Sequence, residues 1–173
     1  MLPVKAILTT VFVVLLLTET TGFSQAVNLD LAEVQKTAEL GDAGSQYLLG
    51  LAYYNGDGVL QDNKKAFFWL TKSASQGNAK GQYVLGRMYQ HGHGVKRDYD
   101  KAIEFYTMSA NQGAAPVQYM LGLMYYHGNC VDRDSSKAIF WLEKAASQGL
   151  TEAIEVLKIL NARTAPDDRG RPQ

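Results

Sequence analysis

The stretch that decides the fold is GDAGSQYLLGLAYYNGDGVLQDNKKAFFWLTKSASQG, residues 41–77, because the chain repeats this pattern twice more. Successive members of one glycine series are 36 residues apart: Gly41, Gly77, Gly113 and Gly149. Tyrosine, leucine, valine, aspartate, lysine and alanine positions recur in the same register. A fixed period of this size is typical of a solenoid, in which each unit packs against its neighbours and about three units are needed for stability.

Each unit is predicted to form two helices joined by a short turn. In the first helix, residues 42–56, the recurring positions fall on one face at helical spacing. Gly50 lies in the middle of this helix, where glycine costs about 1 kcal/mol relative to alanine, so its recurrence predicts close contact with another helix. The second helix is predicted to begin at Asp62, whose carboxylate can cap free backbone N–H groups, and to end at Gly77 in a left-handed cap.

The segments on either side of the repeats lack the full pattern, as expected of the caps that cover the open ends of a solenoid. The polar C-terminal tail, which contains two prolines, has the composition of a disordered segment. We therefore predict seven segments: a signal peptide (1–26), an N-terminal capping helix (27–41), three repeats (42–77, 78–113 and 114–149), a C-terminal capping helix (150–163) and a disordered tail (164–173).

The first residues predict export from the cell. Lys5 precedes an apolar run, residues 6–17, and Ser24 and Ala26 place small residues at the −3 and −1 positions of a cleavage site. The apolar run is shorter than the ~20 residues that span a bilayer, which argues against an uncleaved membrane anchor. We expect an exported protein, periplasmic or secreted, that has no membrane attachment after cleavage.

Composition narrows the classes of partner. The chain has 17 basic and 17 acidic residues and no formal net charge, which argues against nucleic acid or an anionic membrane surface as the main partner. Cys130 is its one cysteine, so no internal disulfide can form, although exported proteins often carry them. We expect a monomer held together by packing, with a Cys130-linked dimer as the alternative. Cys130 also replaces a turn glycine, Gly58 or Gly94 in the other units, and costs about 1 kcal/mol there if the backbone is left-handed.

Motifs that would indicate an enzyme are missing from the sequence. The chain has no G-x-S-x-G, H-E-x-x-H, Walker or C-x-x-C pattern, so we expect neither catalysis nor a cofactor. The stretch HGHGVKRD, residues 91–98, nevertheless raises the hypothesis of a metal site. Its candidate ligands are His91, His93, His127 and Cys130. The first unit has Asn55 and Asp57 at the positions of the first two histidines, and the spacing matches no standard zinc pattern, so we favour exposed loop residues.

The unit reads GxAxxQYxLGxxYxxGxGVxxDxxKAxxWxxxAxxQG over residues 41–77, and this pattern resembles the Sel1-like repeat, a 36-residue relative of the tetratricopeptide repeat. The resemblance implies an all-α fold, a right-handed α-solenoid of helix-turn-helix repeats that acts as a scaffold or adaptor. For an exported bacterial member it implies a protein-binding role in the envelope, with a secreted virulence or host-entry factor as an alternative. A cysteine-rich branch has been associated with β-lactams, but its units carry cysteine pairs that this chain lacks. A β-lactam- or cell-wall-acting enzyme is therefore only a further alternative.

The side of the first helix opposite its recurring residues is the predicted surface for a protein or peptide partner. At about 100° per residue, the same positions of each unit fall on this side, and they vary between the copies. These residues, which we call the first-helix stripe, are Leu48, Leu51, Asn55, Lys80, Val84, Arg87, His91, Met120, Leu123 and His127. Apolar residues flanked by basic ones are typical of a groove for a peptide or helix. The alternative is that the apolar members pack within the protein.

Overall fold

The computed structural model describes residues 31–164, which form helices and turns without a strand. The N-terminal helix of this described part spans residues 31–39, and we call it helix 31–39. The helices that follow are α2 (Ala43–Asn55), α3 (Asn63–Ser75), α4 (Ala79–His91), α5 (Tyr99–Asn111), α6 (Ala115–His127), α7 (Ser135–Ala146) and α8 (Thr151–Thr164). The predicted all-helical solenoid is confirmed. The predicted signal peptide, residues 27–30 of the predicted N-terminal capping helix and residues 165–173 of the predicted tail lie outside the described residues.

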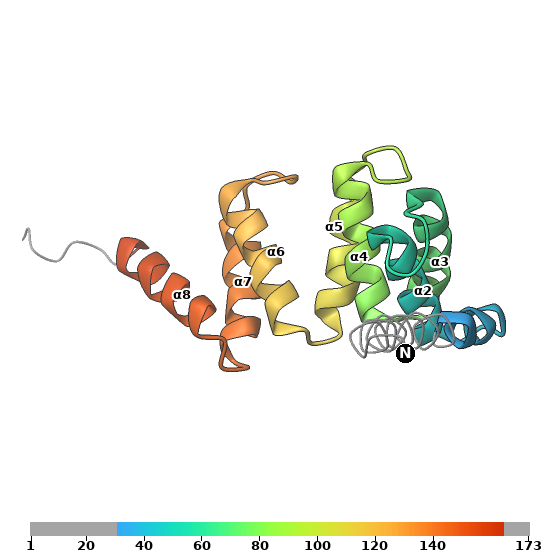
Figure 1. The fold of residues 1–173 in the computed structure, drawn as a ribbon. Coiled ribbons are helices and arrows are strands. Elements are labelled where there is room, and N and C mark those ends of the chain that lie inside the picture. Colours follow the sequence, from blue (N-terminus) through green and yellow to red (C-terminus); the bar gives the residue numbers. More distant parts are fainter. Residues whose placement is uncertain (1–30, 165–173) are drawn as a thin grey trace, which may run out of the picture.

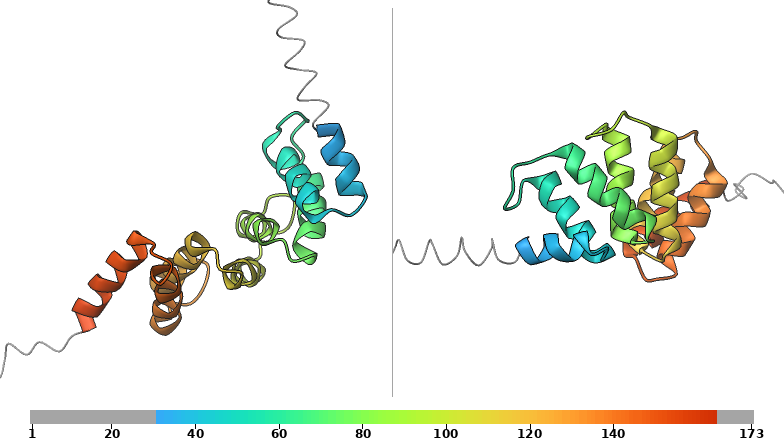
Figure 2. Two further views of the ribbon diagram at one scale, coloured as in Figure 1. Left: turned by 90° about the horizontal axis from the view of Figure 1, so that it is seen from below. Right: turned by 90° about the vertical axis from the view of Figure 1, so that its right-hand side faces the viewer.

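The helices form a curved array of hairpins in which each helix packs on its neighbours along the chain (Figure 1). The pairs α2/α3, α4/α5 and α6/α7 are the three repeats, and α8 follows them at the far end. In the left view of Figure 2 the first helices of the repeats, α2, α4 and α6, lie on the inner side of the curve. The second helices lie on its outer side. No helix among residues 31–164 is long and apolar enough to cross a membrane.

The helix ends follow the predicted cap chemistry. The carboxylates of Asp62, Asp98 and Asp134 accept backbone N–H groups in the first turns of α3, α5 and α7, as predicted from their recurrence. The N–H of Lys137 lowers the pKa of Asp134 below its usual value by bonding to the charged form. Gly77, predicted as a left-handed cap, has φ +85° two residues beyond the end of α3.

The mid-helix glycines mark the closest approach of the two helices within each repeat. A Cβ atom built on Gly50 would lie 2.6 Å from Cγ of Leu70, and one built on Gly122 would lie 2.7 Å from Cγ of Leu142. In the middle repeat the neighbour of Gly86 is the ring of Tyr106, also at 2.7 Å. The close helix contact predicted from the recurrence of Gly50 is confirmed, and the contact compensates for the low helix propensity of glycine.

A ladder of buried glutamines ties the helices together across repeats. Gln46, Gln82 and Gln118 each donate from Nε2 to a carbonyl oxygen at the end of the preceding second helix, that of Ala38, Ala74 or Ala110. Their Oε1 atoms accept hydrogen bonds of 2.7–2.8 Å from Gln76, Gln112 and Gln148. Both ends of each buried amide are therefore satisfied, which avoids the cost of burying an unpaired polar group.

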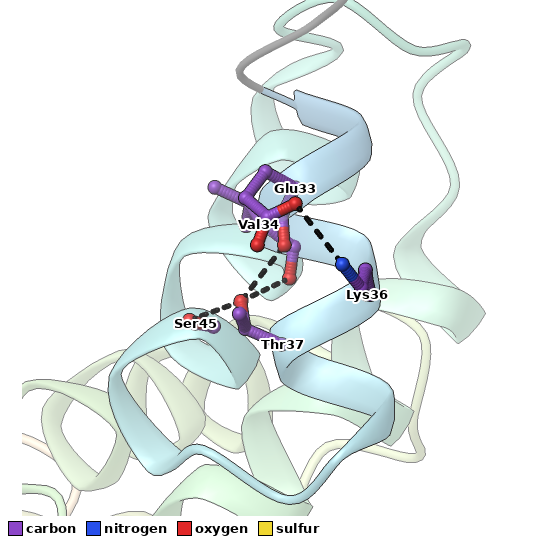
Figure 3. Close-up of polar contacts among 5 residues, drawn as sticks. All are labelled: Glu33, Val34, Lys36, Thr37 and Ser45. Atoms are coloured by element: carbon purple, nitrogen blue, oxygen red, sulfur yellow. Dashed lines mark hydrogen bonds and ion pairs between the residues drawn. The ribbon is translucent and has the colours of Figure 1, made fainter.

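Helix 31–39 takes the place of a second helix that precedes the first repeat. Gln46 bonds to Ala38 as Gln82 does to Ala74, 36 residues later. The Thr37 hydroxyl lies 2.8 Å from the hydroxyl of Ser45 on α2 (Figure 3). Thr37 Oγ1 also donates to carbonyl oxygens of its own helix, whereas its counterpart Ser73 donates to Ala43 on the preceding first helix. Helix 31–39 thus packs as a second helix, and no first helix precedes it within the described residues.

Candidate partner-binding face

The first-helix stripe divides into exposed and part-buried side chains. Its polar members are exposed: Asn55, Lys80, Arg87, His91 and His127. Among the apolar members, Leu48 is 51% exposed, while Leu51 and Met120 are partly buried against the core and Leu123 is partly buried. Both predicted alternatives, an exposed groove and packing within the protein, therefore hold for part of the stripe. Some of its apolar residues face outward, and others pack within the protein.

Val84 does not belong to the surface, and this corrects the predicted stripe. Its side chain is only 5% exposed and lies within the main core cluster. The reason is its place in the array: α4 has α2 before it and α6 after it, so neighbouring helices cover Val84. Leu48, its counterpart in the first repeat, has no first helix before it within the described residues and is half exposed.

Three hollows follow one another along the first helices. The largest, about 470 Å³, lies between helix 31–39 and α2, and we call it the end cleft. Its lining residues are Leu31, Val34, Leu48, Leu51, Ala52, Asn55, Asp57 and Gly58. The next hollow, about 370 Å³, lies between α2 and α4 and shares Leu48 with the end cleft. The third, about 130 Å³, extends toward α6 and shares Tyr47 and Lys80 with the second. Neighbouring hollows thus share lining residues, and the three form a row.

The row coincides only in part with the predicted stripe. Leu48, Leu51, Asn55 and Lys80 line it, whereas Arg87, His91, Met120, Leu123 and His127 line none of these three hollows. Two lining residues are absent from the predicted stripe: Tyr47, which lines the second and third hollows, and Tyr83, which lines the third. Their recurrence assigned them to the core face, yet both are only partly buried, because a large ring can pack at its base and reach the surface at its edge. The signal in the sequence that could have identified them is the phenol hydroxyl, a polar group that favours a place at the edge of the core.

The histidine loop, residues 91–98, does not gather the side chains of the metal hypothesis. Nδ1 of His93 lies 2.8 Å from the hydroxyl of Tyr54, so this half-buried ring joins the second repeat to the first. His91 stacks on His93 and stays exposed, and His127 packs edge-on to Tyr126. Within residues 31–164 no three His, Cys, Asp or Glu side chains lie close enough together to hold a metal ion.

Cys130 lies in a left-handed turn, with φ +62°, the conformation that the glycines at its register adopt in the other two repeats. It is the one residue other than glycine with positive φ in the described part of the chain. Its sulfur lies 3.5 Å from Nε2 of Gln90, whose Oε1 accepts a 2.6 Å hydrogen bond from the hydroxyl of Tyr106. Burial raises the pKa of Tyr106 well above its usual value, which keeps the phenol a hydrogen-bond donor. The Cys130-linked dimer stays a prediction.

The stacked hairpins and their hollowed inner face define an α-solenoid of repeated helix pairs. The chain belongs to the Sel1 repeat family, whose model matches residues 43–78, 79–113 and 115–150. Proteins of this family are in general scaffolds for protein–protein interaction and are typically not enzymes. No curated protein matches the chain.

Solved structures of Sel1 repeat proteins resemble this one. A Sel1 repeat protein from Oxalobacter formigenes is 38% identical, with a TM-score of 0.66, over 75% of this chain and 97% of that one. A protective antigen present in uropathogenic Escherichia coli strains is 37% identical, with a TM-score of 0.69. That alignment covers 75% of this chain and 28% of the antigen. Cysteine rich protein B from Helicobacter pylori, 22% identical over 77% of this chain and 96% of its own, shares the fold at a TM-score of 0.59.

Proposed function

We propose that this protein is a non-enzymatic interaction scaffold of the bacterial envelope, which binds a peptide or helix of a partner protein along its first helices. The observation that carries the proposal is the row of three neighbouring hollows from helix 31–39 to α6. An extended or helical segment needs such a row, because its side chains must enter successive depressions.

The chemistry of the row suits a partner segment that is apolar with acidic flanks. Leu48 and Tyr47 supply apolar and aromatic contact area, and partly exposed tyrosines contribute strongly to protein interfaces. Lys80 lines two of the hollows, and Arg87 is exposed on the same helix. Such rim charges mainly steer the encounter and set its salt dependence.

Residues 1–26 support export as part of the proposal, because their charge, apolar run and small residues match a signal peptide. A second candidate, a secreted factor that contacts host proteins, is supported by the likeness to the protective antigen of uropathogenic E. coli. Immunoblots of periplasm and culture medium separate the two, since a housekeeping scaffold stays in the periplasm.

The test is cross-linking in living cells followed by mass spectrometry, with Lys80→Glu/Arg87→Glu compared with the wild type. We expect the variant to keep its helical circular dichroism and to lose at least tenfold of the captured partner. The matched control is Lys64→Glu/Lys158→Glu, which makes the same charge change at two exposed lysines away from the row. Equal capture by wild type and variant would refute the proposed face. Turnover of a chromogenic β-lactam by the purified protein would refute the non-enzymatic role.

A further inference from the structure

The end cleft lies beside helix 31–39, which no first helix precedes within the described residues. Shifting its lining residues by one period of 36 gives their counterparts around α4. Leu31 and Val34 correspond to Phe67 and Leu70 of α3, while Leu48 and Ala52 correspond to Val84 and Met88 of α4. In the interior of the array Leu70 and Met88 are 0% exposed and Val84 is 5% exposed, while Phe67 is partly buried. The counterparts of Leu51 and Asn55, which are Arg87 and His91, are exposed there. The end cleft is the matching site, and among residues 31–164 no first helix covers its apolar floor.

The interior site shows what fits there, because α2 fills it. Gly50 of α2 meets Leu70, with room for no side chain between them. Four residues later, on the same side of α2, the hydroxyl of Tyr54 contacts His93. His93 is the counterpart of Asp57, which lines the end cleft. A helix with a small residue and, one turn later, a polar side chain therefore matches the interior site.

We propose that the end cleft binds an amphipathic helix of a partner protein in the position that α2 takes at the interior site. The helix carries a glycine against Val34 and, four residues on, a hydrogen-bond donor such as tyrosine, lysine or arginine that faces Asp57. A donor is required because the Asp57 carboxylate only accepts hydrogen bonds, and Asn55 Nδ2 already donates to it at 2.9 Å. The inference rests on the proposed function and names the partner for one part of the row.

A second copy of this chain fits the end cleft poorly. Its available first helix is α8, which lies three periods after α2. Lys158 stands there at the register of Gly50 and is exposed. A lysine at the point of closest approach would meet Val34, where the interior site admits no side chain. The chemistry of the cleft therefore favours a helix from another protein.

The test uses a synthetic peptide with the sequence of residues 42–56, DAGSQYLLGLAYYNG, acetylated and amidated, because α2 is the helix that fills the interior site. The target is the protein recovered from the cell envelope, with its N-terminus read by mass spectrometry. We expect saturable binding by NMR, with shifts in the methyl groups of Leu31, Val34 and Leu48. A peptide carrying Gly50→Leu, or Tyr54→Phe, should bind at least fivefold more weakly.

Protein variants complete the test. Leu48→Glu places a charge in the end cleft at a half-exposed position, so the fold is retained and peptide binding should fall at least tenfold. Leu40→Glu, at a residue that is highly exposed and outside the cleft, is the matched control and should bind as the wild type does. Equal binding of the Gly50→Leu peptide, or shifts confined to other residues, would overturn the proposal.

Two further outcomes would assign the end cleft to another occupant and would also overturn the proposal. A dimer in sedimentation that Leu48→Glu dissolves would indicate a second copy, and protection of Leu48 only in a chain that retains residues 1–26 would indicate the protein's own N-terminal segment. If the peptide does not bind but Lys80→Glu/Arg87→Glu still reduces capture of the partner, this inference is overturned and the proposed function stands. If the peptide binds but that variant captures as much partner as the wild type, the proposed binding along the stripe is overturned and the end-cleft site stands.

Discussion

At the scale of single residues, Cys130 stands out because it occupies a backbone conformation that suits glycine. Left-handed φ brings the Cβ atom of an L-residue close to its own carbonyl oxygen, which costs about 1–2 kcal/mol. The sequence predicted this cost only conditionally, from the glycines at the same register in the other repeats. The structure meets the condition, with φ +62°.

Replacing Cys130 by glycine should therefore stabilise the protein. Part of the relieved strain is offset by the greater freedom of glycine in the unfolded chain, so the expected gain is about 0.5–1 kcal/mol in the free energy of unfolding. Urea denaturation followed by circular dichroism measures it. Cys130→Ser is the control, because serine removes the thiol and keeps the strain. If both variants change stability equally, the thiol and not the backbone is responsible.

His93 shows what comparison between repeats cannot detect at this scale. Aspartate and asparagine stand at its register in the other repeats, and this exchange predicts an exposed, replaceable loop residue. Its contact with Tyr54 depends on a partner 39 residues earlier in the chain, and Gln90 replaces that tyrosine one repeat later. A pair that occurs in a single repeat leaves no periodic signal, and therefore only the structure shows it.

At the scale of helices, the middle repeat differs from the others by a matched exchange. Tyr106 stands where the first and third repeats have Leu70 and Leu142, and Gln90 stands where they have Tyr54 and Tyr126. In the middle repeat the tyrosine thus lies on the second helix, whereas in the other two it lies on the first. The hydroxyl of Tyr106 donates to Oε1 of Gln90 at 2.6 Å. The buried phenol is satisfied only because both positions changed together.

This exchange predicts strong coupling between Gln90 and Tyr106. Tyr106→Leu alone leaves a cavity and removes the donor to Oε1 of Gln90, and Gln90→Tyr alone crowds the ring of Tyr106, so each should cost about 2–3 kcal/mol. The double variant recreates the pattern of the other two repeats and should cost clearly less than the sum. The coupling energy from a double-mutant cycle is expected to be at least about 1 kcal/mol. Additive losses would show that the two positions act independently.

The helices themselves were predictable, because caps, glycines and apolar faces act within a few residues of each other. The repeat register gave the start of each second helix at Asp62, Asp98 and Asp134 and the close contact at Gly50. What the register could not give is the effect of position within the array. Val84 and Leu48 share one register, yet α2 covers the first of them and nothing described covers the second. Exposure on the predicted face thus depends on which repeat a residue belongs to.

At the scale of the whole molecule, the two ends of the helical array differ in how their apolar faces are covered. At the C-terminal end α8 covers a small core cluster around Leu142, Ala145 and Ala153. Lys158 stands at the register of the close-contact glycines, so a further second helix packed there would meet its side chain. At the N-terminal end no first helix precedes helix 31–39 within the described residues, and the end cleft lies there. The C-terminal end is therefore less suited to a further helix than the N-terminal end, where we propose that one binds.

The closed end can be tested by charging its core. Ala153 is 0% exposed, and Ala153→Asp places a carboxylate against Leu142 and Ala145, with an expected loss of at least about 2 kcal/mol. Hydrogen exchange should show the amides of α8 losing protection before those of α4, because α8 contacts only the last repeat. Ile159→Asp, at an exposed position of the same helix, should leave both stability and exchange unchanged. Uniform loss of protection along the array would contradict an independent cap.

The pairing of Gln90 with Tyr106 also limits how an array of this kind can gain or lose units. A genetic crossover in the loop at residues 92–98 separates α4 from α5. The resulting hybrid hairpin places Gln90 opposite a leucine, or Tyr106 opposite a tyrosine, from another repeat. A crossover in the turn at Gly77 or Gly113 transfers both partners together and keeps the phenol satisfied. Insertion or deletion of units in this protein is therefore tolerated best when the unit begins just after one of these glycines, so that each hairpin is inherited whole.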